Sequence, residues 1–136
     1  MTAWYVETSA FVKLVSEEAQ SDALSRWLDE LHWPSDRLVS SDLLRTEARR
    51  VARRSTDAGA YARTLERLER VDLLPLSPEV CDDAGVVEPP TLRSLDAIHM
   101  VAAQTLGDDL AGIVTYDRRM VEAAALHGIV TVSPGA

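Results

Sequence analysis

The chain has 136 residues, a formal net charge of −8 and a hydrophobic content of 46%. This combination predicts one globular domain over residues 1–136, excludes a disordered chain and leaves no apolar run long enough to cross a membrane. The single cysteine, Cys81, excludes a disulfide framework and a thiolate metal cage, and the absence of a signal-peptide pattern predicts a cytoplasmic protein. The negative charge argues against long-range attraction to nucleic acid, although a local basic surface can oppose it.

The first half of the chain alternates predicted strands and helices. Residues 3–6 are aromatic and β-branched and predict a short strand, after which Thr8 or Ser9 can cap a helix that runs to about Val15. Apolar residues at helical spacing predict a second helix, which ends before Pro34. This second helix covers residues 19–31. The elements that follow it are a strand over 37–41, a helix from the cap Ser41 to about Ser55, and a helix over 57–71.

The second half continues the alternation. Residues 71–77 read as a strand interrupted by Pro75, which favours a position at the edge of a sheet. Ser77 and Pro78 open a helix, and residues 86–94 read as a loop. The elements that follow are a helix from the cap Ser94 to about Leu106, a strand over 112–116, a helix from Asp117 that Gly128 ends, and a strand over 129–132. Five short strands separated by helices predict an α/β fold with a central parallel five-stranded sheet.

Two acids directly follow predicted strands. Glu7 comes after the first strand, and Asp117 comes after the strand that contains Thr115. Ligands of parallel α/β sheets bind beyond the carboxyl ends of the strands, so both positions are candidates for a site. Each acid alone is explained as well by its favourable interaction with the dipole of the helix that it begins.

Two further acids lie on predicted helices. Glu47 shares a helical face with apolar residues such as Leu44. It is either a buried functional residue or a residue at the edge of this apolar stripe, where its carboxylate reaches water or an arginine at i+3. Asp96 falls in the first turn of the helix that Ser94 would cap, where acids commonly stabilise the N-terminus. His99 lies one turn further on and is expected to be a structural hydrogen-bonding group rather than a ligand.

The four acids become informative as a set. If the fold gathers them at one end of the sheet, they repel one another, and their pKa values rise unless a cation neutralises them. Oxygen ligands select Mg²⁺ or Mn²⁺ over zinc, and the three histidines show no zinc-ligand spacing. The sequence contains no G-x-S-x-G motif and no glycine-rich phosphate loop, which argues against a serine hydrolase and a nucleotide-binding loop.

The chain resembles the PIN-domain family and, within it, the VapC-type toxins of bacterial toxin–antitoxin pairs. The segments that carry the resemblance are "YVETSAFVKL", "SSDLLRTEARR", "SLDAIHMVAA" and "IVTYDRRMVEAA", in order between about residues 3 and 134. The resemblance implies a PIN-like fold, a five-stranded parallel sheet flanked by helices. It also implies Mg²⁺- or Mn²⁺-dependent endonucleolytic cleavage of RNA.

The resemblance also implies roles for individual residues. The metal-binding and catalytic acids would be Glu7, Glu47, Asp96 and Asp117, with Thr115 or Ser9 as a supporting hydroxyl. The family normally has aspartate where this chain has Glu7, so the longer side chain either still binds the ion or weakens the site. A PIN-like module that binds RNA or protein without cleavage is therefore an alternative, and a structure-specific DNA nuclease is a less favoured one.

Partners follow from the same resemblance. RNA phosphates would contact basic residues near the acids, namely Lys13, Arg118 and Arg119. The arginines at 49, 50, 53 and 54 are interpreted as a solvated helix face in preference to an RNA contact. A cognate antitoxin protein and a homodimer are implied by the family.

Overall fold

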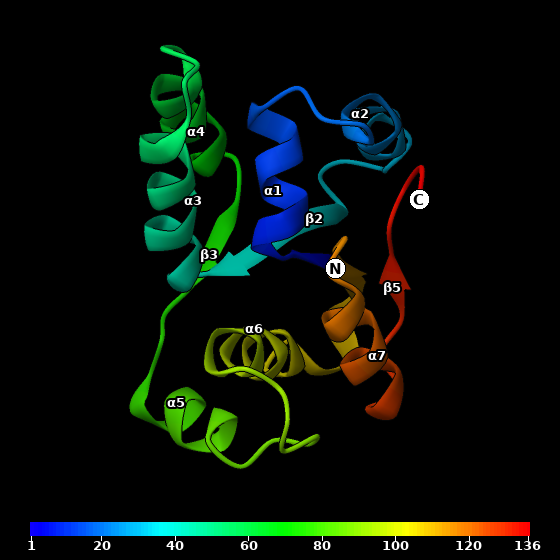
Figure 1. The fold of residues 1–136 in the computed structure, drawn as a ribbon. Coiled ribbons are helices and arrows are strands. Elements are labelled where there is room, and N and C mark those ends of the chain that lie inside the picture. Colours follow the sequence, from blue (N-terminus) through cyan, green and yellow to red (C-terminus); the bar gives the residue numbers. More distant parts are fainter.

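The computed structural model describes residues 1–136, and its centre is a five-stranded parallel sheet in the order β3-β2-β1-β4-β5 (Figure 1). The strands are β1 (Thr2–Val6), β2 (Asp36–Ser41), β3 (Asp72–Leu74), β4 (Leu110–Val114) and β5 (Thr131–Val132). The predicted α/β fold with a parallel sheet is therefore confirmed. The central strand β1 pairs with β2 and β4, and Val6 lies opposite Val114 in register.

Helices cover both faces of the sheet. One layer contains α1 (Thr8–Val15), α2 (Ser21–Asp29), α3 (Leu43–Arg54) and α4 (Ala60–Leu68), and the other contains α6 (Ser94–Gln104) and α7 (Arg118–Leu126) (Figure 1). The short helix α5 (Pro78–Ala84) packs against α6, and a 3₁₀ turn (Gly107–Asp109) leads into β4. None of the helices combines the length and the apolar content needed to span a membrane.

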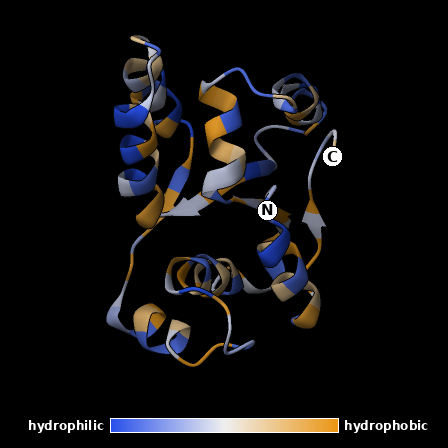
Figure 2. Cartoon of the chain, in the orientation of Figure 1, coloured by the Kyte–Doolittle hydropathy of each residue, from blue (hydrophilic) through white to orange (hydrophobic).

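The alternation of side chains along β1 divides the core into two parts. Val6 packs with Phe11 and the rest of the core under α1 to α4, whereas Tyr5 packs with Met100 and Ile113 under α6 and α7. Figure 2 shows hydrophobic residues along α1, which lies inside its layer, and many hydrophilic residues on α3. Tyr5 is therefore directed toward α6, which matters for the site described below.

Two helices are shorter than the sequence pattern predicted. The helix expected from residue 57 begins at Ala60, because the carboxylate of Asp57 accepts a hydrogen bond from Gly59 N at 2.9 Å and forms a turn of its own. The helix expected from residue 19 begins at Ser21, whose hydroxyl donates to the carbonyl of Ser16 at 2.9 Å. Side chains that bond to nearby backbone thus make these helices begin later than apolar periodicity indicates.

The strands differ from the prediction mainly in their ends. β3 stops at Leu74, before Pro75, and lies at the edge of the sheet as predicted. β4 covers Leu110–Val114 rather than 112–116, so Thr115 lies just beyond the strand. β5 contains only Thr131–Val132 of the four residues expected. The shift in β4 places Thr115 at the carboxyl edge of the sheet.

Helix caps were predicted less well. Ser77 caps α5 as expected, accepting a hydrogen bond from Val80 N at 3.2 Å. The N-cap of α3 is Asp42 rather than Ser41, which is the last residue of β2. The caps of α1 and α6 also differ from the prediction, and both belong to the candidate site.

Candidate active site

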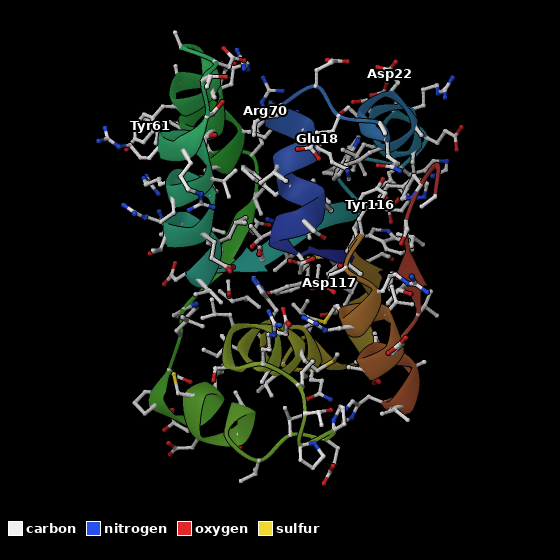
Figure 3. The ribbon with its side chains drawn as sticks, viewed as in Figure 1. Glu18, Asp22, Tyr61, Arg70, Tyr116 and Asp117 are labelled. Atoms are coloured by element: carbon white, nitrogen blue, oxygen red, sulfur yellow. The ribbon has the colours of Figure 1, made fainter.

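The carboxyl ends of two neighbouring strands bring Glu7 and Asp117 to one edge of the sheet. Glu7 directly follows β1, and its backbone N–H donates to the carbonyl of Val114 at 3.0 Å, the last residue of β4. Asp117 follows β4 by three residues and begins α7. In the view of Figure 3, Asp117 lies between α1 and α6, the helices that belong to opposite layers.

Glu7 itself is the N-cap of α1, so the expectation that Thr8 or Ser9 would cap this helix was wrong. Its carboxylate folds back and accepts a hydrogen bond from Ser9 N at 3.0 Å. The hydroxyls of Ser9 and Thr115 also donate to it, at 2.5 and 2.6 Å. Glu7 is only 5% exposed, and these three donors stabilise its buried charge.

Ser9 and Thr115 connect the surroundings of Glu7 with those of Asp117. Their hydroxyl oxygens are 3.3 Å apart. Ser9 Oγ accepts from Tyr116 N at 2.9 Å, and Thr115 Oγ1 accepts from Asp117 N at 3.1 Å. Each hydroxyl thus donates to the Glu7 carboxylate and accepts from the backbone after β4. Both supporting hydroxyls of the sequence prediction lie beside Glu7.

Asp117 is the N-cap of α7, as its position after the strand suggested. Its Oδ1 accepts a hydrogen bond from Arg119 N at 2.9 Å, which satisfies one free N–H of the first helical turn. Its Oδ2 accepts no hydrogen bond. One oxygen therefore stabilises the helix, and the other remains available to a ligand.

Asp96 is the third residue of α6, whose N-cap is Arg93 and not Ser94 as predicted. No side chain caps this helix, so Asp96 does not serve as its capping group. Burial raises the pKa of Asp96 above its ordinary range, and the charges of Asp117 and Glu7 raise it further, against an opposing effect of His99. The carboxyl group is half-buried among like charges.

Glu47 reaches the same neighbourhood from α3. The buried stripe of this helix consists of Leu44, Ala48 and Ala52, so Glu47 lies at its edge with a side chain that is 21% exposed. It does not pair with an arginine. Its Oε1 accepts hydrogen bonds from Thr8 Oγ1 and from His99 Nε2, both at 2.6 Å.

The environment keeps Glu47 ionised. Burial alone would raise its pKa, but the hydrogen bonds from His99 and Thr8 hold the pKa below the ordinary value. Glu47 also contributes to the raised pKa of Asp96, which places the two carboxylates within electrostatic reach of each other. Asp96 is therefore the member of the set on which the repulsion is concentrated.

The four acids interact electrostatically, but they do not form a complete metal-binding site. No group of three or more His, Cys, Asp or Glu side chains is arranged to hold a metal ion in this conformation. The donors nevertheless fit a hard divalent cation: they are all carboxylate oxygens, they repel one another at Asp96, and Asp117 Oδ2 and Glu47 Oε2 accept no hydrogen bond. Binding an ion requires these side chains to move closer together.

The basic residues expected near the acids differ in their availability. Lys13 pairs with Glu18 at 3.0 Å and lies over the ring of Tyr116, so its side chain is only 12% exposed. Arg118 and Arg119 are exposed at the start of α7, and neither forms an ion pair. On α3, Arg50, Arg53 and Arg54 are exposed, and Arg49 donates to the carbonyl of Arg45 at 3.0 Å.

Two contributors were missed from the sequence: Thr8, which was expected only as a helix cap and donates to Glu47, and Tyr5. Tyr5 is fully buried, and its hydroxyl lies 2.7 Å from His99 Nδ1. A tyrosine in a strand reads as a core residue, and no local pattern links it to a histidine on a helix 94 positions away. The only available signal was the alternation along β1, which separates Tyr5 from its neighbours Trp4 and Val6.

The fold and the site define an α/β protein with clustered carboxylates at the carboxyl edge of a parallel sheet. The model of the PIN domain matches residues 4–126, and the chain belongs to the PIN-domain family. The chain is 45% identical to Ribonuclease VapC46 of Mycobacterium tuberculosis over 136 residues, covering 98% of this chain and 99% of that protein. It is 39% identical to Ribonuclease VapC47 of the same species over 132 residues, covering 97% of each.

Solved structures share the fold at lower identity. The crystal structure of Mycobacterium tuberculosis VapC20, described as a sarcin-ricin loop cleaving toxin, matches with a TM-score of 0.72 at 17% identity, over 96% of this chain and 99% of that one. A toxin–antitoxin complex from Klebsiella pneumoniae matches with a TM-score of 0.68 at 18% identity, over 96% of each chain. These likenesses support the fold, whereas the full-length relatives support the family assignment.

Proposed function

We propose that this protein is a metal-dependent endoribonuclease and the toxin of a toxin–antitoxin pair. The observation that carries the proposal is the set of carboxylates at the edge of the sheet, with Asp96 held among like charges that a cation would neutralise. The full-length relatives named as ribonucleases support the same conclusion. The family also supports RNA as the substrate.

The residues that would hold Mg²⁺ or Mn²⁺ are Glu7, Glu47, Asp96 and Asp117. When bound, such an ion stabilises charge on the transferring phosphate and makes its coordinated water more acidic. Glu47 has a lowered pKa, so it serves as an anion that orients water through Oε2 rather than as a store for a proton. Asp117 offers Oδ2 while Oδ1 keeps α7 in place.

The surrounding residues position the acids and the substrate. Ser9 and Thr115 hold the Glu7 carboxylate and prevent it from swinging freely. Arg118 and Arg119, exposed beside Asp117, are available to RNA phosphates. Lys13 is already held by Glu18 and Tyr116, so it would have to leave these contacts to bind RNA.

Partners and location belong to the same proposal. A cognate antitoxin would cover the acid site and block RNA, and the toxin–antitoxin complex among the structural neighbours supports such a partner. The proposal also includes a homodimer and a cytoplasmic location. Size-exclusion chromatography with light scattering tests the dimer, and a mass of one chain, 14.9 kDa, would contradict it.

One observation favours a second candidate function, a PIN-like module that binds RNA or a partner without efficient cleavage. Glu7 stands where the family normally has aspartate, and three donors already occupy its buried carboxylate. A cation has to compete with these donors for Glu7. A weakened or inactive site is the outcome if it cannot.

Cleavage assays distinguish these functions. The parent is incubated with labelled RNA and DNA oligonucleotides in Mn²⁺, in Mg²⁺ and in EDTA. Asp117→Asn removes a charge while asparagine still caps α7, and Asp108→Asn removes an exposed charge before β4, at the opposite end of the sheet.

We expect RNA cleavage that needs the metal, is lost in Asp117→Asn and persists in Asp108→Asn. Cleavage in EDTA, or equal cleavage by Asp117→Asn, would contradict the proposal. Binding of RNA without cleavage in any metal would support the second candidate function. Preferential cleavage of structured DNA would indicate a DNA nuclease.

A further inference from the structure

A buried hydrogen-bonded chain lies directly behind one of the acids. Tyr5 on β1 contacts His99 on α6 at 2.7 Å, and His99 Nε2 contacts Glu47 Oε1 on α3 at 2.6 Å. Tyr5 is 0% exposed and His99 is 1% exposed, so water does not compete for these bonds. The chain joins three elements from both layers of the fold.

The partners fix the direction of the hydrogen bonds. A phenol hydroxyl can donate or accept a hydrogen bond, whereas the Glu47 carboxylate only accepts. His99 Nε2, which lies 2.6 Å from Glu47 Oε1, therefore carries a proton, and in a neutral imidazole Nδ1 then has none and accepts from the Tyr5 hydroxyl at 2.7 Å. With Nδ1 as acceptor, the proton of a neutral imidazole is on Nε2 and points to the Glu47 carboxylate.

This arrangement leaves Glu47 with one occupied oxygen and one free oxygen. Oε1 accepts from His99 Nε2 and from Thr8 Oγ1, and Oε2 accepts no hydrogen bond. A free glutamate side chain loses rotamer entropy when it is ordered. Here the fold has already ordered the side chain before any cation or substrate arrives.

We propose that His99, held by Tyr5, is a positioning residue for the acid site: it fixes Oε1 of Glu47 and leaves Oε2 as the only oxygen of that carboxylate available to a cation or a water. The part of this inference that concerns catalysis rests on the proposed metal-dependent cleavage. The part that concerns the orientation of Glu47 does not. Groups that orient a metal-binding carboxylate typically contribute about 10- to 100-fold in metal affinity or activity.

Two amide substitutions distinguish the contact made by His99 Nε2 from the contact made by His99 Nδ1. In His99→Gln the amide nitrogen can take the place of Nε2 and donate to Glu47. In His99→Asn the shorter amide takes the place of Nδ1, so it keeps the contact with Tyr5 and loses Glu47. Both replace a buried ring by an amide, which makes them matched controls for the loss of packing. Urea unfolding in EDTA reports how far each is destabilised.

The readout is the affinity for Mn²⁺ alone, measured by calorimetry, together with kcat and KM on RNA. We expect His99→Asn to bind Mn²⁺ at least about tenfold more weakly and to lose kcat more than KM, and we expect His99→Gln to recover most of both. Parental Mn²⁺ affinity in His99→Asn would overturn the proposal. If the parent binds Mn²⁺ in a His99-dependent way but does not cleave RNA, the proposed function fails and the positioning role stands.

A measurement on the unaltered protein covers the case in which both variants fail to fold. The ¹⁵N chemical shifts of the His99 ring report which nitrogen carries the proton. We expect a proton on Nε2, the nitrogen that faces Glu47. An unprotonated Nε2 would overturn the proposal, because His99 could not then donate to Glu47, and so would a parent protein that binds no Mn²⁺.

Discussion

Replacing an acid of the site by its amide should have opposite effects on stability at two neighbouring positions. Glu7 accepts hydrogen bonds from Ser9 N, Ser9 Oγ and Thr115 Oγ1, whereas Asp96 caps no helix and has its pKa raised by burial and by its neighbours' charges. Without metal, Glu7→Gln should destabilise the protein. Asp96→Asn should leave its stability equal or higher.

The magnitude for Glu7→Gln follows from counting acceptors. An amide offers one carbonyl oxygen, so at least one of the three donors faces an NH₂ group instead of an acceptor. A hydrogen bond to a charged group contributes about 1.5–3 kcal/mol, and an unpaired buried donor adds to the loss. After allowing for relieved repulsion, we expect a loss of about 2–4 kcal/mol, or on the order of 10 °C in melting temperature.

The assay is urea unfolding at pH 7 in EDTA for the parent, Glu7→Gln, Asp96→Asn and the control Asp108→Asn. The control should lie within about 0.5 kcal/mol of the parent, as exposed substitutions usually do. Glu7→Gln as stable as the parent would refute the role of the three donors. A large loss in Asp96→Asn would mean that Asp96 stabilises the start of α6 and is not a repelled member of a site.

Three further predictions concern pH, metal and side-chain length. Because the folded-state pKa of Asp96 is raised above its ordinary 3.8, the charge of Asp96 lowers the stability of the protein at neutral pH. This loss of stability should shrink as pH falls through the raised pKa and vanish below 3.8, so the parent and Asp96→Asn should converge in urea unfolding at low pH. Mn²⁺ at ten times its dissociation constant should stabilise the parent by about 1.4 kcal/mol at neutral pH and less at acid pH, and a melting temperature that Mn²⁺ leaves unchanged would count against the site. Glu7→Asp should raise the initial rate of Mn²⁺-dependent RNA cleavage and Glu7→Gln should remove it, since a misplacement of about 1 Å can cost roughly a hundredfold in rate; equal rates in parent and Glu7→Gln would show that Glu7 is not a ligand.

The fold was predictable because its signals are local. Alternating apolar strands and helices indicated a parallel sheet, and parallel strands bring their carboxyl ends to one edge. That rule alone placed Glu7 and Asp117 on the same edge, since each directly follows a predicted strand; in the structure Glu7 directly follows β1 and Asp117 comes three residues after β4. The ends of the elements were less predictable, because single side chains such as Asp57 bond to the backbone and delay the start of a helix.

The details of the site depend on contacts between distant segments. Nothing around Glu7 indicated that it would fold back to cap α1 and receive a hydroxyl from a residue 108 positions away. The bond between Glu47 and His99 spans 52 positions, and neither residue's helical pattern specifies the other. Periodicity predicted that Glu47 could lie at the edge of the apolar stripe on α3. Only the packing of α3 against α6 shows that its hydrogen-bond partner is a histidine and not an arginine.

The most direct test of the proposed site is the position of Mn²⁺ in a crystal of this protein soaked with the ion. Anomalous diffraction at the manganese edge locates the metal without any assumption about activity. We expect a peak in contact with Asp96, Asp117 Oδ2 and Glu47 Oε2, with Glu7 either coordinating the ion or still bound to Ser9 and Thr115. A peak elsewhere, or no peak at a Mn²⁺ concentration that supports RNA cleavage, would contradict a metal-dependent nuclease site at these acids.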